Sequence, residues 1–166
     1  MWAKGNTVTI TYTLTRLNRM GSNQVAVWIE DGQGKLVKTI FATDFMAMRK
    51  GRKIRPQCCP EWVKAADLEN MSDEEIDAIS GATQKPGKTV LTWDCTDTKG
   101  KPVPPGAYLY KVEGNIAMEQ RVVWTGGIVV GKTASTSAAF PLFMPDARKT
   151  TPTLLADVAA RFSPAE

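Results

Sequence analysis

The segment TVTITYTLT, residues 7–15, alternates apolar and polar side chains without interruption. In an extended chain Val8, Ile10, Tyr12 and Leu14 fall on one face and the threonines on the other, because successive strand residues point to opposite faces. A helix would distribute the same apolar residues around its circumference. The pattern therefore predicts a half-buried β-strand, which requires a sheet that rests on a core.

Residues 23–45, NQVAVWIEDGQGKLVKTIFATDF, predict two further strands joined by a hairpin at residues 31–34, DGQG. Alternation divides the first of these strands into two apolar faces. Val25, Val27 and Ile29 lie on one face, and Ala26 and Trp28 lie on the other. We therefore expect this strand to be covered on both sides.

A helical insertion follows at about residues 60–80. PEWVKAADLEN and SDEEIDAIS predict two short helices, the second with a capping box formed by Ser72 and Glu75. Gly81 stands where a helix stop is expected. Residues 88–95, 107–115 and 120–131 resume strand character, and the glycines of the last segment suggest a bulge or a bend.

The end of the chain, TPTLLADVAARFS, places Leu154, Leu155, Val158 and Phe162 on one stripe of a helix. It predicts a terminal amphipathic helix or a frayed end. Together the patterns predict a mainly β protein, an antiparallel immunoglobulin-like (Ig-like) β-sandwich with a short helical insertion and a C-terminal helix. We expect one domain over residues 5–131, and an irregular or helical extension over residues 132–166.

The chain contains no histidine and three cysteines, Cys58, Cys59 and Cys95. The absence of imidazole excludes histidine-based triads and most zinc sites, so no catalytic residue and no metal site is predicted. The cysteines are expected to be buried thiols. A disulfide between Cys95 and either Cys58 or Cys59, or between Cys58 and Cys59, remains open. Trp28, Trp62, Trp93 and Trp124 are expected in the core.

The net charge is +4, and five cations gather in RKGRKIR. This basic cluster consists of Arg49, Lys50, Arg52, Lys53 and Arg55. It predicts either a site for an anionic partner or a solvated loop balanced by the acidic helices that follow. No aromatic residues interleave with it, so nucleic-acid binding is not expected. No apolar run approaches the roughly 20 residues that cross a bilayer, and no signal peptide or membrane insertion is predicted.

Residues 93–114, WDCTDTKGKPVPPGAYLYKVEG, resemble the C-terminal hairpin of the Ig-like domain of flagellar hook-capping proteins. In that hairpin a tryptophan precedes an aspartate-rich turn, and a Val-Pro-x-Gly-x-Tyr segment opens the next strand. The positions that carry the resemblance are Trp93, Asp94, Asp97, Gly100, Val103, Pro104, Gly106, Tyr108 and Tyr110. We expect the two aspartates to bind their own turn amides rather than calcium.

The order of these segments over residues 5–131 resembles the predicted periplasmic proteins of domain-of-unknown-function family 2271. The resemblance implies an exported, periplasmic Ig-like domain. It also implies an association with flavin-transfer and membrane electron-transfer proteins as partners.

The stretch DAISGAT, residues 77–83, is similar to the acceptor sequence of ApbE-type flavin transferases, which transfer FMN from FAD to a threonine hydroxyl. By this resemblance Thr83 is the attachment point for FMN. Asp77, Ser80, Gly81 and Ala82 form the recognition motif. The alternative reading is a helix stop, in which Ser80 and Thr83 hold a turn.

The resulting prediction is a non-enzymatic, extracytosolic accessory domain for flavin-dependent electron transfer that carries FMN on Thr83. A non-redox, Ig-like structural module of an envelope complex remains the alternative.

Overall fold

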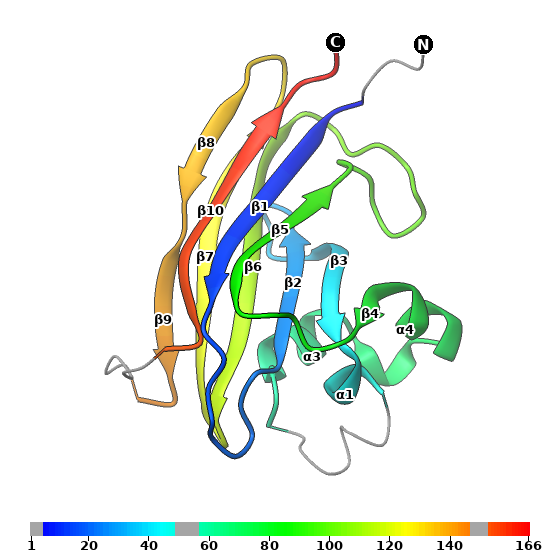
Figure 1. The fold of residues 1–166 in the computed structure, drawn as a ribbon. Coiled ribbons are helices and arrows are strands. Elements are labelled where there is room, and N and C mark those ends of the chain that lie inside the picture. Colours follow the sequence, from blue (N-terminus) through cyan, green and yellow to red (C-terminus); the bar gives the residue numbers. More distant parts are fainter. Residues whose placement is uncertain (1–4, 49–56, 147–152) are drawn as a thin grey trace.

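A computed structural model describes residues 5–48, 57–146 and 153–166 of the chain. Two β-sheets face each other, and short helices lie beside one of them (Figure 1). Strands account for 50% of the residues and helices for 14%. The predicted mainly β sandwich with a short helical insertion is therefore confirmed.

The first sheet has four strands in the order β5-β1-β10-β8, and the second has six in the order β4-β3-β2-β6-β7-β9. Neighbouring strands are antiparallel except for β3 and β4, which run parallel. The strands are β1 (Thr7–Leu14), β2 (Val25–Glu30), β3 (Leu36–Thr43), β4 (Ser80–Gly81), β5 (Gly87–Trp93), β6 (Gly106–Ala117), β7 (Gln120–Val130), β8 (Ser135–Ala138), β9 (Phe140–Met144) and β10 (Leu155–Ser163).

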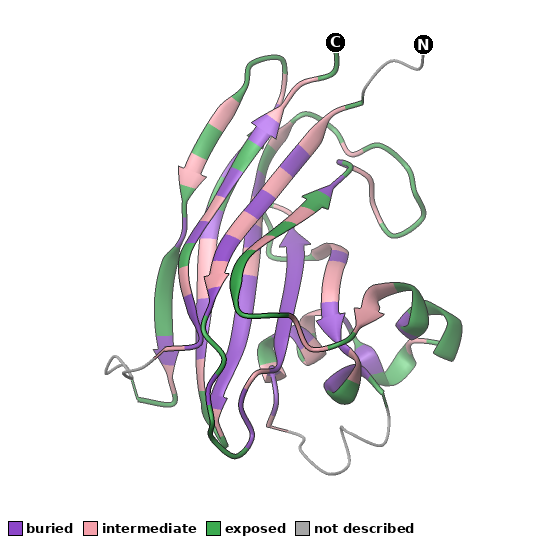
Figure 2. Cartoon of the chain, in the orientation of Figure 1, coloured by how far each residue is buried: buried purple, intermediate pink, exposed green. Residues whose placement is uncertain are grey.

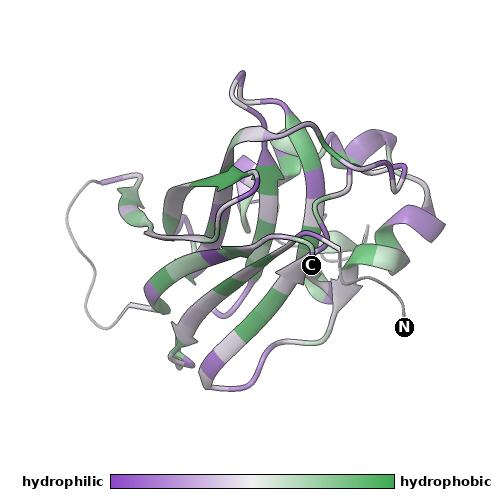
Figure 3. Ribbon diagram, turned by 90° about the horizontal axis from the view of Figure 1, so that it is seen from above, coloured by the Kyte–Doolittle hydropathy of each residue, from purple (hydrophilic) through white to green (hydrophobic). Residues whose placement is uncertain are grey.

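Alternation along the strands builds the core between the sheets, as predicted for β1. Buried and half-buried residues alternate along this strand, and Val8, Ile10, Tyr12 and Leu14 are at most 2% exposed (Figure 2). Seen from above, apolar and polar bands succeed one another along the strands of both sheets (Figure 3). The sandwich is therefore held by burial of one apolar face from each sheet.

A second core lies on the outer face of the six-stranded sheet, beneath the helices. All six residues of β2 are buried. Val25, Val27 and Ile29 belong to the core between the sheets, whereas Ala26 and Trp28 belong to the second core. The prediction that this strand is covered on both sides is confirmed, and the molecule has three layers.

The helical layer consists of α1 (Asp44–Ala47), α3 (Pro60–Ala65), the 3-10 helix η1 (Leu68–Asn70) and α4 (Asp73–Ile79). α4 begins with the predicted capping box. The Ser72 hydroxyl accepts the Glu75 amide at 3.2 Å, and the Glu75 carboxylate accepts the Ser72 amide at 2.7 Å. These bonds satisfy two amides that a helix otherwise leaves without partners.

The prediction of a C-terminal helix is wrong, because Leu155–Ser163 forms β10 between β1 and β8. A register shift opposite Thr11–Thr13 places Asp157 in a left-handed conformation with φ of 54°. The irregularity puts two residues between the buried Leu155 and Val158, while Val158, Ala160 and Phe162 follow at every second residue. In the sequence alone, this mixed spacing of two and three residues resembles the apolar stripe of a helix.

Gly126 of β7 allows close packing and does not form a bulge. Pairing of β6 with β7 is continuous past Gly126, and the register shifts instead between Asn115 and Ala117. A Cβ atom on Gly126 would overlap the ring of Tyr110. The expected bulge at this glycine is therefore wrong, and close approach of a ring explains the residue.

Candidate functional site

The predicted acceptor motif, residues 77–83, begins in α4 and ends beside the six-stranded sheet. Asp77 is exposed on α4, and Ser80 and Gly81 form β4, which pairs with Ala42 and Thr43 of β3. Residues 82–86 then cross to β5 in the other sheet without regular structure (Figure 1). The motif therefore lies where the chain passes from one sheet edge to the other.

Gly81 is not a left-handed helix stop, in contrast to the alternative reading of the motif. α4 ends at Ile79, and the amide of the extended residue Ser80 donates to the Ile76 carbonyl. Gly81 has no positive φ, but a Cβ atom there would lie 2.9 Å from Cε2 of Phe41. The residue is small because strand β4 passes against an aromatic ring.

Thr83 is half-buried, between the exposed Ala82 and the half-buried Gln84. Its hydroxyl makes no hydrogen bond to another residue within the described ranges. The segment is held on both sides, because β4 precedes it and the Tyr12 hydroxyl donates to Gln84 Oε1 at 2.6 Å. A partly exposed alcohol without a competing hydrogen bond is a suitable nucleophile for attack on phosphorus once a base of another enzyme activates it.

A groove with a volume of about 520 Å³ adjoins the motif. It lies between β3, α4 and the end of β5, and Ala78 and Ile79 of the motif segment form part of its wall. On its polar side Lys38 Nζ lies 3.1 Å from Asp94 Oδ1 and 2.7 Å from Thr96 Oγ1. These contacts connect β3 to the residues that follow β5.

The basic cluster, residues 49–55, lies outside the described residues. The aspartates of the 93–114 hairpin hold turns, as expected. Asp94 Oδ1 accepts the Thr96 amide at 3.1 Å, and Asp97 Oδ1 accepts the amides of Lys99 and Lys101 at 2.9 Å each. Within the described ranges no group of three or more histidine, cysteine or carboxylate residues is arranged to hold a metal ion.

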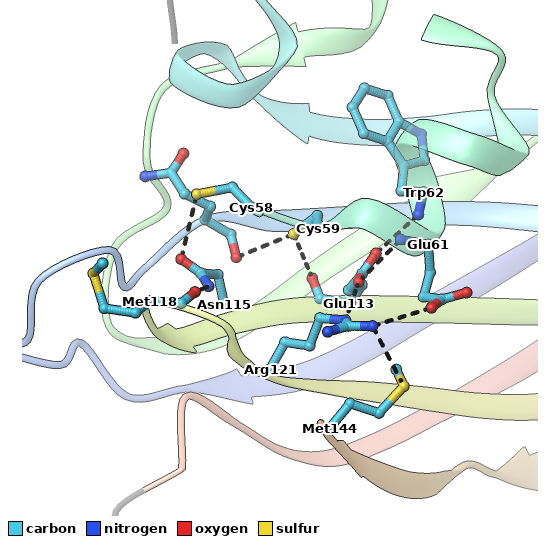
Figure 4. A network of polar contacts seen from close by, with 10 residues as sticks. Cys58, Cys59, Glu61, Trp62, Glu113, Asn115, Met118, Arg121 and Met144 are labelled. Carbon is cyan, nitrogen blue, oxygen red and sulfur yellow. Dashed lines mark hydrogen bonds and ion pairs between the residues drawn. The ribbon is translucent and has the colours of Figure 1, made fainter. Parts of the chain in front are cut away.

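A buried polar network beneath α3 was missed by sequence reasoning (Figure 4). Glu113 of β6 is fully buried, and its carboxylate accepts the amides of Glu61 at 3.3 Å and Trp62 at 2.9 Å. Arg121 Nε lies 3.4 Å from Glu113 Oε1, an ion-pair contact without hydrogen-bond geometry. Burial raises the pKa of Glu113 to about 7, although the two amides and Arg121 act in the opposite direction.

No local pattern in the sequence was sufficient to find Glu113, because its neighbours are known only from the fold. Glu113 pairs across the sheet with Ala26, whose face was predicted to be covered. A carboxylate at such a position requires buried donors, and the first amides of α3 supply them.

The cysteines are buried thiols and form no disulfide. Cys58 Sγ lies 3.4 Å from Asn115 Oδ1, and Cys59 Sγ lies 3.7 Å from the carbonyl oxygens of Gln24 and Glu113 (Figure 4). Burial, and then the charge of Glu113, raises the pKa of Cys59 well above the usual range. Cys95 lies in the other core, so the six-stranded sheet separates it from the adjacent pair. Thiol chemistry is therefore not favoured at this site.

Fold and site together define a two-sheet β-sandwich domain with a helical layer and an anchored segment that presents a threonine hydroxyl. The family model described as "predicted periplasmic protein (DUF2271)" matches residues 6–140. The chain therefore belongs to this family, and the periplasmic location that its description gives is the one predicted from the sequence. No curated protein and no solved structure matches the chain. None of the described helices is long and apolar enough to cross a membrane.

Proposed function

We propose that this protein is an extracytosolic accessory domain for flavin-dependent electron transfer that carries FMN covalently on Thr83. The observation that carries the proposal is the Thr83 hydroxyl, which is partly accessible, has no hydrogen bond within the described residues and lies on an anchored extended segment. An acceptor side chain engaged by a neighbouring amide would first have to lose that bond.

The attachment is a phosphoryl transfer from FAD, catalysed by a separate flavin transferase. Thr83 Oγ forms a bond to the phosphorus on the FMN side, and the diphosphate bond to AMP breaks. AMP leaves with the bridging oxygen, and the hydroxyl proton passes to a base of the transferase. The neighbouring Ala82 is exposed and has a small side chain, so it hinders the approach to this hydroxyl little.

The test is coexpression with an active flavin transferase, followed by intact mass measurement. We expect the wild type and Thr83→Ser to gain the mass of FMN less water, and Thr83→Ala to gain nothing. Thr136→Ala, which removes an exposed hydroxyl in β8, is the matched control and is expected to be modified. A wild type that stays unmodified while a control acceptor is modified would refute the proposal.

One observation favours the alternative, a non-redox structural module. β9 is the edge strand of the six-stranded sheet, and Phe140 and Leu142 on it are 76% and 55% exposed. The strand register places them on the same outer face as Val129, which is 56% exposed. Exposed apolar rows at a sheet edge are typical of protein contact surfaces. An unmodified wild type whose oligomeric state changes in Phe140→Ser would support this function.

A further inference from the structure

The groove beside the acceptor motif is chemically divided into two walls. Its apolar side chains come mainly from β3 and the helical layer, which also contributes the carboxylate of Glu75, and its other polar groups come mainly from Lys38 of β3 and the end of β5. The apolar wall includes Leu36, Ile40, Ala66, Met71 and Ile79, and the polar wall includes Lys38, Thr92, Asp94 and Thr98. Its volume of about 520 Å³ lies within the range of about 300–1,000 Å³ that is typical of small-molecule sites.

We propose that this groove binds the isoalloxazine ring of the FMN that is attached to Thr83. The inference rests on the proposed function and names where the ring lies after attachment. One edge of an isoalloxazine is a dimethylbenzene, which suits an apolar wall. The opposite edge carries carbonyl oxygens and an N–H group, for which Lys38, Asp94 and the threonines of the polar wall offer donors and acceptors.

The tether is long enough for this arrangement. Ile79 is part of the groove wall and lies four residues before Thr83. Four residues place Thr83 at most about 14 Å from Ile79, and the ribityl phosphate (about 9 Å, with bonds of about 1.5 Å) together with the half of the isoalloxazine beyond its ribityl nitrogen (about 5 Å) reaches about as far. The pairing of Ser80 and Gly81 with β3 fixes the start of this path beside the groove. A ring bound next to its own attachment point also benefits from a high effective concentration.

The experiment measures how far iodide reaches the flavin of the modified full-length protein. A ring in the groove loses about 70–90% of its accessible surface, so the iodide quenching constant should be about three- to tenfold lower than in urea. Fluorescence anisotropy should also be high in the folded protein and fall in urea. Equal quenching constants in the folded and unfolded proteins would overturn the inference.

Two substitutions in β5 distinguish the loss of binding in the groove from a general effect of adding a phenyl ring to this strand. Thr92→Phe places a ring in the groove and should raise the quenching constant about threefold or more towards the value in urea. Val90→Phe is the matched control, because Val90 is exposed on the same strand two residues earlier and lies outside the groove. Met71→Arg, on the opposite wall, is a second blocking variant. Equal values in the wild type and both blocking variants would contradict the proposal.

Intact mass measurement tests the attachment of FMN to Thr83 independently of the binding of its ring in the groove. Blocking variants that gain FMN but lose shielding support the groove, and attachment without shielding refutes the groove alone. If no variant gains FMN, the same groove is tested with free FMN and the Thr83→Ala protein. Binding that Thr92→Phe removes and Val90→Phe retains then supports the groove, whereas no binding overturns it.

Discussion

At the N-terminus of α3 a single buried carboxylate, Glu113, meets two backbone amides and the Arg121 side chain. Its pKa is about 7 in the folded protein and 4.5 in the reference state. Between these values the folded state binds one more proton than the unfolded state, so the free energy of unfolding falls as pH rises. The loss approaches about 1.4 kcal/mol for each pH unit and amounts to about 2 kcal/mol from pH 5 to 7.5.

The Glu113→Gln variant removes this titration. We expect its free energy of unfolding to vary much less than that of the wild type between pH 5 and 7.5, as measured by urea denaturation. The lowered pKa values of Asp94 and Asp97 act below this window, so they do not interfere. Parallel pH profiles for the two proteins would contradict the assignment.

Two adjacent glycines in β7 give a second test at the scale of single residues. Gly126 lies against the Tyr110 ring, whereas the nearest atom to a Cβ on Gly127 is the Tyr108 carbonyl oxygen at 4.0 Å. Gly126→Ala therefore overpacks the core and should destabilise by about 1–3 kcal/mol. Gly127→Ala should change stability by no more than about 0.5 kcal/mol. Thermal unfolding of the pair measures the difference, and equal effects would rule out the packing explanation.

Single residues were the scale at which sequence reasoning failed most often. Gly81 was explained as a helix stop, but its role is contact with Phe41, a residue 40 positions away in the chain. Glu113 was counted as one more position in an alternating strand, although its partners come from α3. Both roles depend on neighbours that are distant in the sequence. Local patterns contain no information about which neighbours these are.

At the scale of elements, β10 is the feature that most separates the structure from the sequence prediction. It pairs with β1 along most of its length, and Phe162 is fully buried in the core between the sheets. A frayed terminal helix would instead leave this side chain with little effect on stability.

Phe162→Ala should therefore reduce the free energy of unfolding by about 3–5 kcal/mol, the usual cost of a large cavity. Arg161→Ala, the exposed neighbour on the same strand, should change it by about 0.5 kcal/mol or less. Urea unfolding of both variants measures the two costs. Similar small values would show that β10 is not part of the core in solution.

At the scale of the whole molecule, the sequence was sufficient to predict the sandwich, the helical insertion and the covering of β2 on both sides. The prediction was based on the strict alternation in β1 and on the two apolar faces of β2, because both patterns depend only on strand geometry. Strand order and the groove depend on which sheet edges meet, and no local pattern specifies this. The proposed acceptor motif was inferred from its residues alone, whereas the anchoring of the Thr83 segment by β4 and Tyr12 required the fold.

The most direct measurement is tandem mass spectrometry of the tryptic peptide 65–88 from protein coexpressed with an active flavin transferase. This peptide contains three hydroxyl side chains, those of Ser72, Ser80 and Thr83. We expect one FMN, and fragment ions that place it on Thr83. An unmodified peptide alongside a modified control acceptor, or a flavin located on another residue, would contradict the proposal.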